Sequence, residues 1–272
     1  MRRRDLLHAA LGLAMTKTKK RLPVLFIGHG SPMNAIDTPW SRGFRALAKL
    51  LPQPEAIVSV SAHWYTRGTF LTGEPRPRTI HDFGGFPRAL YEIEYPAAGK
   101  PDLAARIAKL LAGAELRTDW GLDHGTWSVL RHLRPAADVP VVQLSIDARL
   151  APERHLEIGR ALRPLREEGV LVLGSGNVTH NLRHAFQHGG EGTPQWAARF
   201  DSEIARALEQ RDAAHLVRAL DTEEGRLSHP SPDHYLPLLY AAGAADERDG
   251  VRFPIEGFDL SSLSMRAALF GS

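Results

Sequence analysis

The run Leu22-Pro-Val-Leu-Phe-Ile-Gly-His29 is a short apolar segment that ends in glycine and histidine. Glu55-Ala-Ile-Val-Ser-Val-Ser-Ala-His63 has the same character. Continuous apolar runs of this length, bounded by turn residues, are typical of buried strands. We predict such strands at four places: Pro23–Ile27, Ala56–Ser61, Val139–Ile146 and Val170–Leu173.

Longer amphipathic stretches separate these runs and predict helices. They lie at Ser41–Leu51, Asp102–Leu111, Glu153–Glu168, Gln195–Glu209, Ala213–Leu220 and from about Asp233 onward. Alternation of apolar runs with helices indicates a layered α/β domain. The segment Gly68–Ala98 is rich in glycine, proline and aromatic residues and fits neither period. We expect a long ordered loop there, and such loops tend to be functional.

The net charge of +3 is unevenly distributed along the 272 residues. Residues 1–21 contain seven basic side chains and one acidic one, so the remainder, residues 22–272, is slightly acidic. A slightly acidic body offers no electrostatic footprint for a phosphate backbone, so we expect no nucleic-acid partner. The hydrophobic fraction of 43% is ordinary for a globular protein, and because no linker-like stretch divides the chain we expect one domain over residues 22–272. A monomer and a small homo-oligomer both remain open.

The N-terminal segment 1–21 has two interpretations. Its arginines followed by an apolar run resemble the start of a twin-arginine export signal. The apolar run is short, however, and no Ala-x-Ala cleavage site follows. We therefore expect a disordered extension or a vestigial signal, and a cytoplasmic rather than a periplasmic location. No stretch approaches the roughly 18–20 apolar residues that span a bilayer, so no transmembrane segment is expected.

Histidines follow three of the predicted strand regions. His29 and His63 close the first two apolar runs, and His180 lies a few residues beyond the last. Ligand sites in open α/β sheets form outside the carboxyl ends of the strands, so the three should converge if their strands are neighbours. His124 and His234 lie in similar turn-like surroundings. Because the chain has no cysteine, any metal must be held by histidine or a carboxylate.

The remaining histidines are weaker candidates. His81 lies in the predicted loop, where it could line a pocket or hold the loop. Seven others are expected to be solvated: His8, His132, His155, His184, His188, His215 and His229. A single histidine after a strand is more often structural than a ligand, but three at equivalent positions favour a site. The residues alone thus indicate a histidine-rich metal or acid–base site at the edge of the sheet.

Six motifs resemble, in order, those of the 4,5-DOPA extradiol dioxygenases of the class III extradiol ring-cleavage superfamily. They are LFIGHGSPMN (25–34), VSAHW (60–64), TIHDFGGFP (79–87), GLDHGTW (121–127), GSGNVTHNL (174–182) and PDHYLPLLY (232–240). The resemblance implies a three-layer α/β domain with a central, largely parallel or mixed sheet flanked by helices. It also implies one divalent metal, Fe(II) for activity with Zn(II) as an alternative occupant.

The resemblance also implies roles for the five histidines. His29 and His63 match two metal ligands, and His180 matches the general base of the wider superfamily or a further ligand. His234 occupies the region where the wider superfamily supplies a carboxylate ligand, which is the main departure from the usual site of two histidines and one carboxylate. His124 resembles a histidine that contacts substrate or bound oxygen.

The implied reaction is the cleavage by O2 of a small aromatic diol, DOPA-like or related, to a ring-opened semialdehyde. His81, Phe83 and Phe86, together with Trp64 and Trp127, could form the wall of the substrate pocket, although plain core packing is an equal alternative for the aromatic residues. Two rivals use the same histidines: a zinc-dependent hydrolase and a non-catalytic metal-binding relative. The Gly174-Ser-Gly176 sequence is not the nucleophile elbow of a serine hydrolase.

Overall fold

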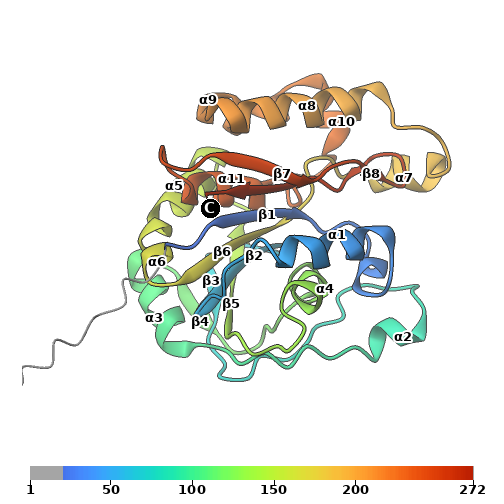
Figure 1. Cartoon of the computed structure of the whole chain (residues 1–272). Coiled ribbons are helices and arrows are strands. Elements are labelled where there is room, and N and C mark those ends of the chain that lie inside the picture. The colour runs from blue at the N-terminus through green and yellow to red at the C-terminus, as the bar shows by residue number, and fades with distance from the viewer. Residues whose placement is uncertain (1–20, 272) are drawn as a thin grey trace, which may run out of the picture.

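A mixed eight-stranded sheet forms the centre of the computed structural model, which describes residues 21–271 (Figure 1). Its strand order is β4-β3-β5-β2-β6-β1-β10-β7. β5, β2, β6 and β1 are parallel, whereas β10 pairs antiparallel with β1 and with β7, and β3 pairs antiparallel with β5. The strand bounds are β1 Val24–Gly28, β2 Ala56–Thr66, β3 Phe70–Thr72, β4 Glu115–Arg117, β5 Val141–Asp147, β6 Val170–Gly176, β7 Val251–Ile255 and β10 Ala267–Phe270.

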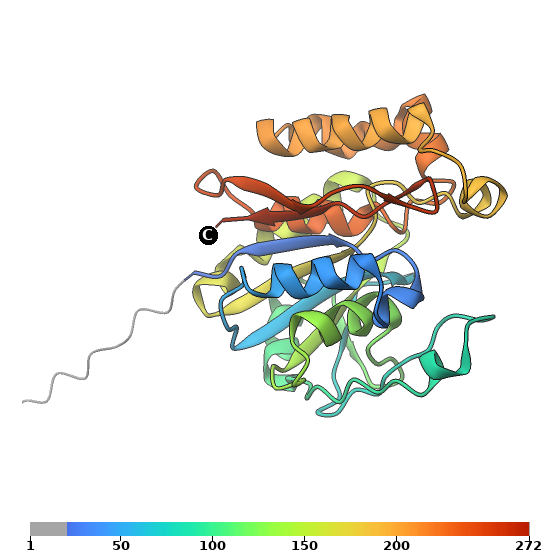
Figure 2. The same cartoon turned by 45° about the vertical axis from the view of Figure 1, so that its right-hand side comes forward.

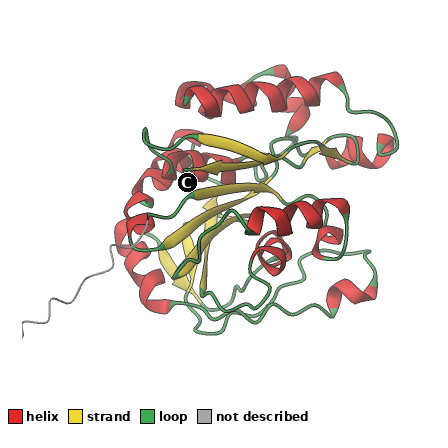
Figure 3. Cartoon of the chain, in the orientation of Figure 1, coloured by secondary structure: helices red, strands yellow, loops and turns green. Residues whose placement is uncertain are grey.

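Helices cover both faces of this sheet, as the red and yellow elements in Figure 3 show. On one face, residues of α1 and α4 belong to the same core cluster as Leu25 and Ile27 of β1; on the other, residues of α3, α5 and α11 share a cluster with Val24 and Phe26. The helices are α1 Pro39–Ala48, α2 Arg88–Tyr91, α3 Pro101–Leu110, α4 His124–Leu133, α5 Pro152–Ala161, α6 Arg163–Glu167, α7 Leu182–His188, α8 Gln195–Gln210, α9 Ala213–Arg218, α10 Glu223–Ser228 and α11 Leu236–Ala244. The predicted three-layer α/β fold is therefore confirmed.

All four predicted strands are present as the parallel centre of the sheet. β1, β5 and β6 are buried along their whole length, which explains why each reads as a continuous apolar run. The two outermost strands on each side of the sheet, β4 and β3 on one side and β10 and β7 on the other, were not predicted. A further two-stranded sheet joins β8 (Phe258–Asp259) and β9 (Leu263–Ser264). In Figures 1 and 2, α8 and α9 lie beyond the β7–β10 edge.

Three predicted elements differ from the structure. The single helix expected at Glu153–Glu168 is interrupted at Leu162, because Pro164 has no N–H to donate and its ring crowds the preceding turn. The last predicted helix begins at Leu236 instead of near Asp233. The expected loop 68–98 contains the short elements β3 and α2.

Two expectations concern the chain ends and membranes. Apart from Arg21, the N-terminal extension 1–21 lies outside the described residues, so its interpretation stays a prediction. Within residues 21–271, none of the helices combines the length and the apolar character needed to span a bilayer.

Candidate active site

The carboxyl ends of three neighbouring parallel strands bring the predicted histidines together. β2, β6 and β1 are adjacent in the sheet, so His63 of β2, His180 beyond β6 and His29 after β1 reach the same edge. The register of β2 against β5 shifts between Val60 and Tyr65, and His63 lies in this irregular stretch. His124 is the first residue of α4, and His234 lies just before α11.

Distances between the imidazole rings separate three evenly spaced histidines from two others, each of which lies much closer to one of the three. The ring centres of His29, His63 and His234 are 5.1, 5.2 and 5.0 Å apart. His124 lies only 3.8 Å from His63, and His180 stacks on His234 at 3.4 Å with an interplanar angle of 3°. The sequence could not give this division, because it depends on distances between remote segments.

Hydrogen bonds reach the Nδ1 atom of three rings, and Nδ1 of a fourth, His63, lies at ion-pair distance from a carboxylate. The Ser175 hydroxyl donates to the Gly125 carbonyl at 2.5 Å, so its oxygen accepts from His29 Nδ1 at 3.1 Å. Asp82 contacts Nδ1 of both His63 and His124, and Asp233 contacts Nδ1 of His234. A ring that donates through Nδ1 carries its lone pair on Nε2, the atom that can bind a metal.

The electrostatic surroundings favour neutral rings. Burial, reinforced by neighbouring histidines, holds the pKa of His29 and of His234 well below the ordinary value. Burial also lowers the pKa of His63 and of His180 to about 3. At neutral pH these imidazoles are therefore uncharged, the form that binds a divalent metal or accepts a proton.

The partly buried carboxylate of Asp82 is ionised beside these rings. Its burial alone would raise its pKa, but hydrogen bonds from the His124 side chain and backbone, together with attraction to the two rings, outweigh burial and lower the pKa to about 2. This part of the site therefore combines neutral nitrogen donors with one negative charge.

A cavity of about 710 Å³ opens onto the histidines. Its apolar wall contains Met33, Trp40, Phe83, Phe86 and Leu263, and Phe186 of α7 lies at the cavity with 78% of its surface exposed. The size and the mostly apolar wall suit an aromatic ring, with the polar groups gathered at one end.

Three residues predicted for the pocket wall do not line this cavity. Trp64 follows His63 on β2 and so points to the opposite side, where it stacks on Trp120 with ring centres 5.4 Å apart. Trp127 is fully buried and donates its indole N–H to the Ile80 carbonyl. His81 forms a hydrogen bond with the Ile93 carbonyl at 3.0 Å. All three therefore support the surrounding structure, whereas Phe83 and Phe86 do line the cavity.

Sequence reasoning missed several residues of the site. Asp82 lies inside one of the quoted motifs, but its contact with His124 joins residues 42 positions apart. The Ser175–His29 contact spans 146 positions. Trp40, Phe186 and Leu263 gave no signal, because exposed or isolated apolar residues are common in any chain.

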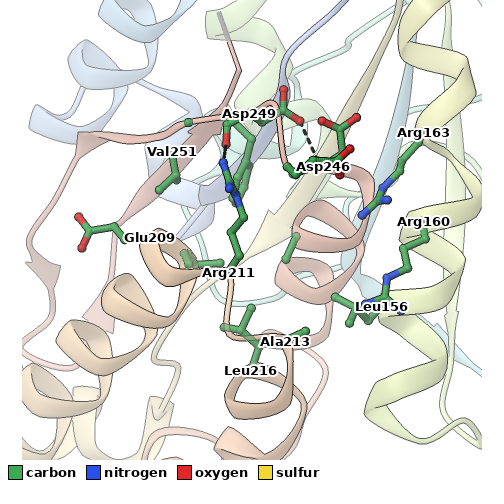
Figure 4. Close-up of a pocket in the computed structure, with 16 residues that line it drawn as sticks. Leu156, Arg160, Arg163, Glu209, Arg211, Ala213, Leu216, Asp246, Asp249 and Val251 are labelled. Carbon is green, nitrogen blue, oxygen red and sulfur yellow. Dashed lines mark hydrogen bonds between the residues drawn. The ribbon is translucent and has the colours of Figure 1, made fainter.

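A second cavity, of about 250 Å³, lies between α5, α9 and the loop before β7 (Figure 4). Arginines and carboxylates dominate its polar lining, and no histidine is among its lining residues 156–270. Asp249 there is already engaged by the buried Arg166 guanidinium and by Arg21. The histidine-lined cavity is therefore the better candidate for metal chemistry.

Comparison with known proteins identifies the family. Residues 10–271 match the family described as the catalytic LigB subunit of aromatic ring-opening dioxygenase. The chain belongs to the LigB family. The expected family and enzyme class, an extradiol ring-cleavage dioxygenase, are thereby confirmed.

Named relatives of this LigB-family chain carry the same description. The chain is 48% identical to the 4,5-DOPA dioxygenase extradiol of Escherichia coli K12, over 92% of this chain and 95% of the relative. It is 38% identical to the protein of that name from Beta vulgaris, over 91% and 96% of the two chains. A crystal structure of an uncharacterised Escherichia coli K12 protein superposes with a TM-score of 0.81 at 43% identity, covering 92% of this chain and 100% of that chain.

Proposed function

We propose that this chain cleaves a small aromatic diol, DOPA-like or related, by extradiol insertion of both atoms of O2, using one Fe(II) held by His29, His63 and His234. The spacing of the three rings carries this proposal. An imidazole nitrogen about 2.1 Å from a metal puts its ring centre roughly 3.2 Å from that metal, so tetrahedrally arranged rings are about 5.2 Å apart. The observed separations of 5.0 to 5.2 Å fit this requirement.

The same criterion argues against His124 and His180 as further ligands. The nitrogens of His29, His63 and His124 lie within 4.8 Å of one another, which alone would allow a metal. However, ring centres 3.8 Å apart (His63–His124) or 3.4 Å apart (His180–His234) would require two ligands at an acute angle. We therefore assign His124 and His180 to roles beside the metal.

His180 is the proposed general base. Its ring faces the cavity and makes no hydrogen bond to another residue of the described chain, so both nitrogens are available. A phenolic hydroxyl has a pKa near 10, so a neutral imidazole beside the diol assists its ionisation at neutral pH. Bound Fe(II) would supply the positive charge that stabilises the ionised diol and the electron transfer that O2 needs.

His124 and the aromatic wall would orient the reactants. Asp82 holds His124 by its Nδ1 and by its backbone N–H, so its Nε2 edge has a fixed direction. We propose that this edge contacts oxygen atoms of the substrate or of O2. Phe83 and Phe86 would pack on the ring of the diol and exclude water.

Anaerobic reconstitution of chelated protein tests this function. Fe(II) is added, then a panel of catechols including DOPA, and O2 uptake and visible absorbance are followed together. O2 consumption matched to a coloured ring-opened product with Fe(II), and not with Zn(II), is the expected result. Stoichiometric binding of Fe(II) without O2 uptake would refute it and would favour zinc chemistry on the same histidines. We also propose a cytoplasmic location, testable by fractionation of cells that express the full chain.

A further inference from the structure

The loop between β3 and α2 inserts one carboxylate between two histidines of the site. Asp82 lies beyond the bridge that joins Thr79 to Leu122, and it reaches β2 and the first turn of α4 at once. We infer that Asp82 is a positioning residue that keeps His63 and His124 in the tautomer with an unprotonated Nε2. The inference rests on the proposed metal-binding function of His63.

Both oxygens of this carboxylate are in use. Oδ2 lies 3.2 Å from His63 Nδ1 and 2.9 Å from His124 Nδ1, and Oδ1 accepts the backbone N–H of His124 at 2.8 Å. An ionised carboxylate can only accept hydrogen bonds. These contacts therefore favour a hydrogen on each Nδ1, and a neutral ring of this tautomer keeps the lone pair on Nε2.

The position of His29 Nε2 shows why the tautomer of His63 with an unprotonated Nε2 matters for metal binding. His63 Nε2 lies 3.1 Å from His29 Nε2, and the Ser175 contact gives His29 the same tautomer. Two lone pairs facing each other at this distance repel unless a cation lies beside them. The Asp82 contact therefore favours the His63 tautomer whose Nε2 can bind a metal. It disfavours the other tautomer, in which the Nε2–H of His63 would donate a hydrogen bond to Nε2 of His29.

Asp82 also supplies charge that the three imidazole ligands lack. Its Oδ1 accepts the N–H of His124, the first residue of α4, and the partial positive charge at this helix end stabilises the carboxylate. Carboxylates that bind the far nitrogen of a metal-ligating histidine raise its basicity, and their loss typically weakens metal binding about 10- to 100-fold. Within residues 21–271, Asp82 is the carboxylate that contacts two of the site's rings, whereas Asp233 contacts one.

Metal affinity and histidine tautomers test the role of Asp82 without any oxygenase assay. Calorimetry with Zn(II) should show about 10- to 100-fold weaker binding for Asp82→Asn than for the parent protein. Asp119→Asn removes an exposed carboxylate paired with Arg117 and should leave the affinity unchanged. Co(II) absorption should change in Asp82→Asn and stay unchanged in the control. Wild-type Zn(II) affinity and an unchanged Co(II) spectrum in Asp82→Asn would overturn the inference.

Nitrogen-15 NMR of the metal-free parent protein needs no variant and decides the matter if Asp82→Asn fails to fold. His63 and His124 should be protonated at Nδ1, and neutral rings protonated at Nε2 would overturn the inference. Zn(II) binding does not depend on O2. A protein that binds Zn(II) through Asp82-oriented histidines yet opens no ring with Fe(II) would therefore refute the proposed function and leave this inference standing.

Discussion

Two buried histidines outside the metal site predict a steep loss of stability in mild acid. His155 of α5 forms a hydrogen bond with the Tyr240 hydroxyl, and His229 forms one with the Val178 carbonyl. The second ring nitrogen of each, Nε2 of His155 and Nδ1 of His229, is buried without a partner. Burial lowers the pKa of both rings to about 4.

The sign and size of the effect follow from proton uptake on unfolding. A histidine with an unfolded pKa near 6.5 is mostly neutral at pH 7 and mostly protonated at pH 5, whereas the folded rings, with a pKa of about 4, stay largely neutral at both. The unfolded chain binds more protons, so stability falls as the pH drops below about 6.5 and levels off near the folded pKa. Between pH 7 and 5 each ring should lower the free energy of unfolding by about 2 kcal/mol.

Urea unfolding of metal-free protein at the two pH values measures this loss. The double variant His155→Gln/His229→Gln cannot take up these protons, so its acid-induced loss should be smaller than that of the parent by about 4 kcal/mol. Histidines of the metal site titrate in both proteins, so their contribution cancels in the difference. An equal loss in parent and variant would refute the assignment of these rings as buried and neutral.

Three further predictions concern other parts of the molecule. Gly176→Ala would put a Cβ atom 2.1 Å from the His234 carbonyl oxygen, so calorimetry should show Zn(II) affinity reduced by at least about tenfold. Asp249→Ala would leave the buried Arg166 guanidinium without its ion pair, and urea unfolding should show a loss of about 3–5 kcal/mol. Phe186→Ala should leave the free energy of unfolding within about 0.5 kcal/mol of the parent and raise KM for the diol, and an unchanged KM would contradict its place in the substrate site.

The central strands could be predicted from sequence because burial on both faces makes them continuous apolar runs. β3 and β4 could not, since each has only three residues and β4 is mostly exposed. The helix break before Pro164 could have been predicted from the proline itself. The edge of the sheet is thus harder to predict than its centre.

Three histidines expected to be solvated are buried: His132, His155 and His229. Each is buried with a hydrogen-bond partner that lies far away in sequence. The Asn34 carbonyl, which contacts His132 Nε2, is 98 positions from it. A sequence pattern shows that a histidine is polar, but it cannot show that a remote segment will satisfy its ring. The prediction of solvated histidines was therefore wrong where tertiary partners exist.

The place of the active site and the roles within it depend on different kinds of information. Strand order alone brings His29, His63 and His180 to one edge, so the location could be predicted from apolar runs that end near histidine. The roles of the individual histidines depend on distances of a few ångströms between their rings. The number of residues between two histidines in the sequence does not determine these distances. A third set of residues, including Phe83 and Phe186, lines the cavity from a loop and from α7, outside the parallel strands, and we propose that it selects the substrate. Substitutions there should change which diol is accepted, whereas those at the strand ends should change whether a metal is held.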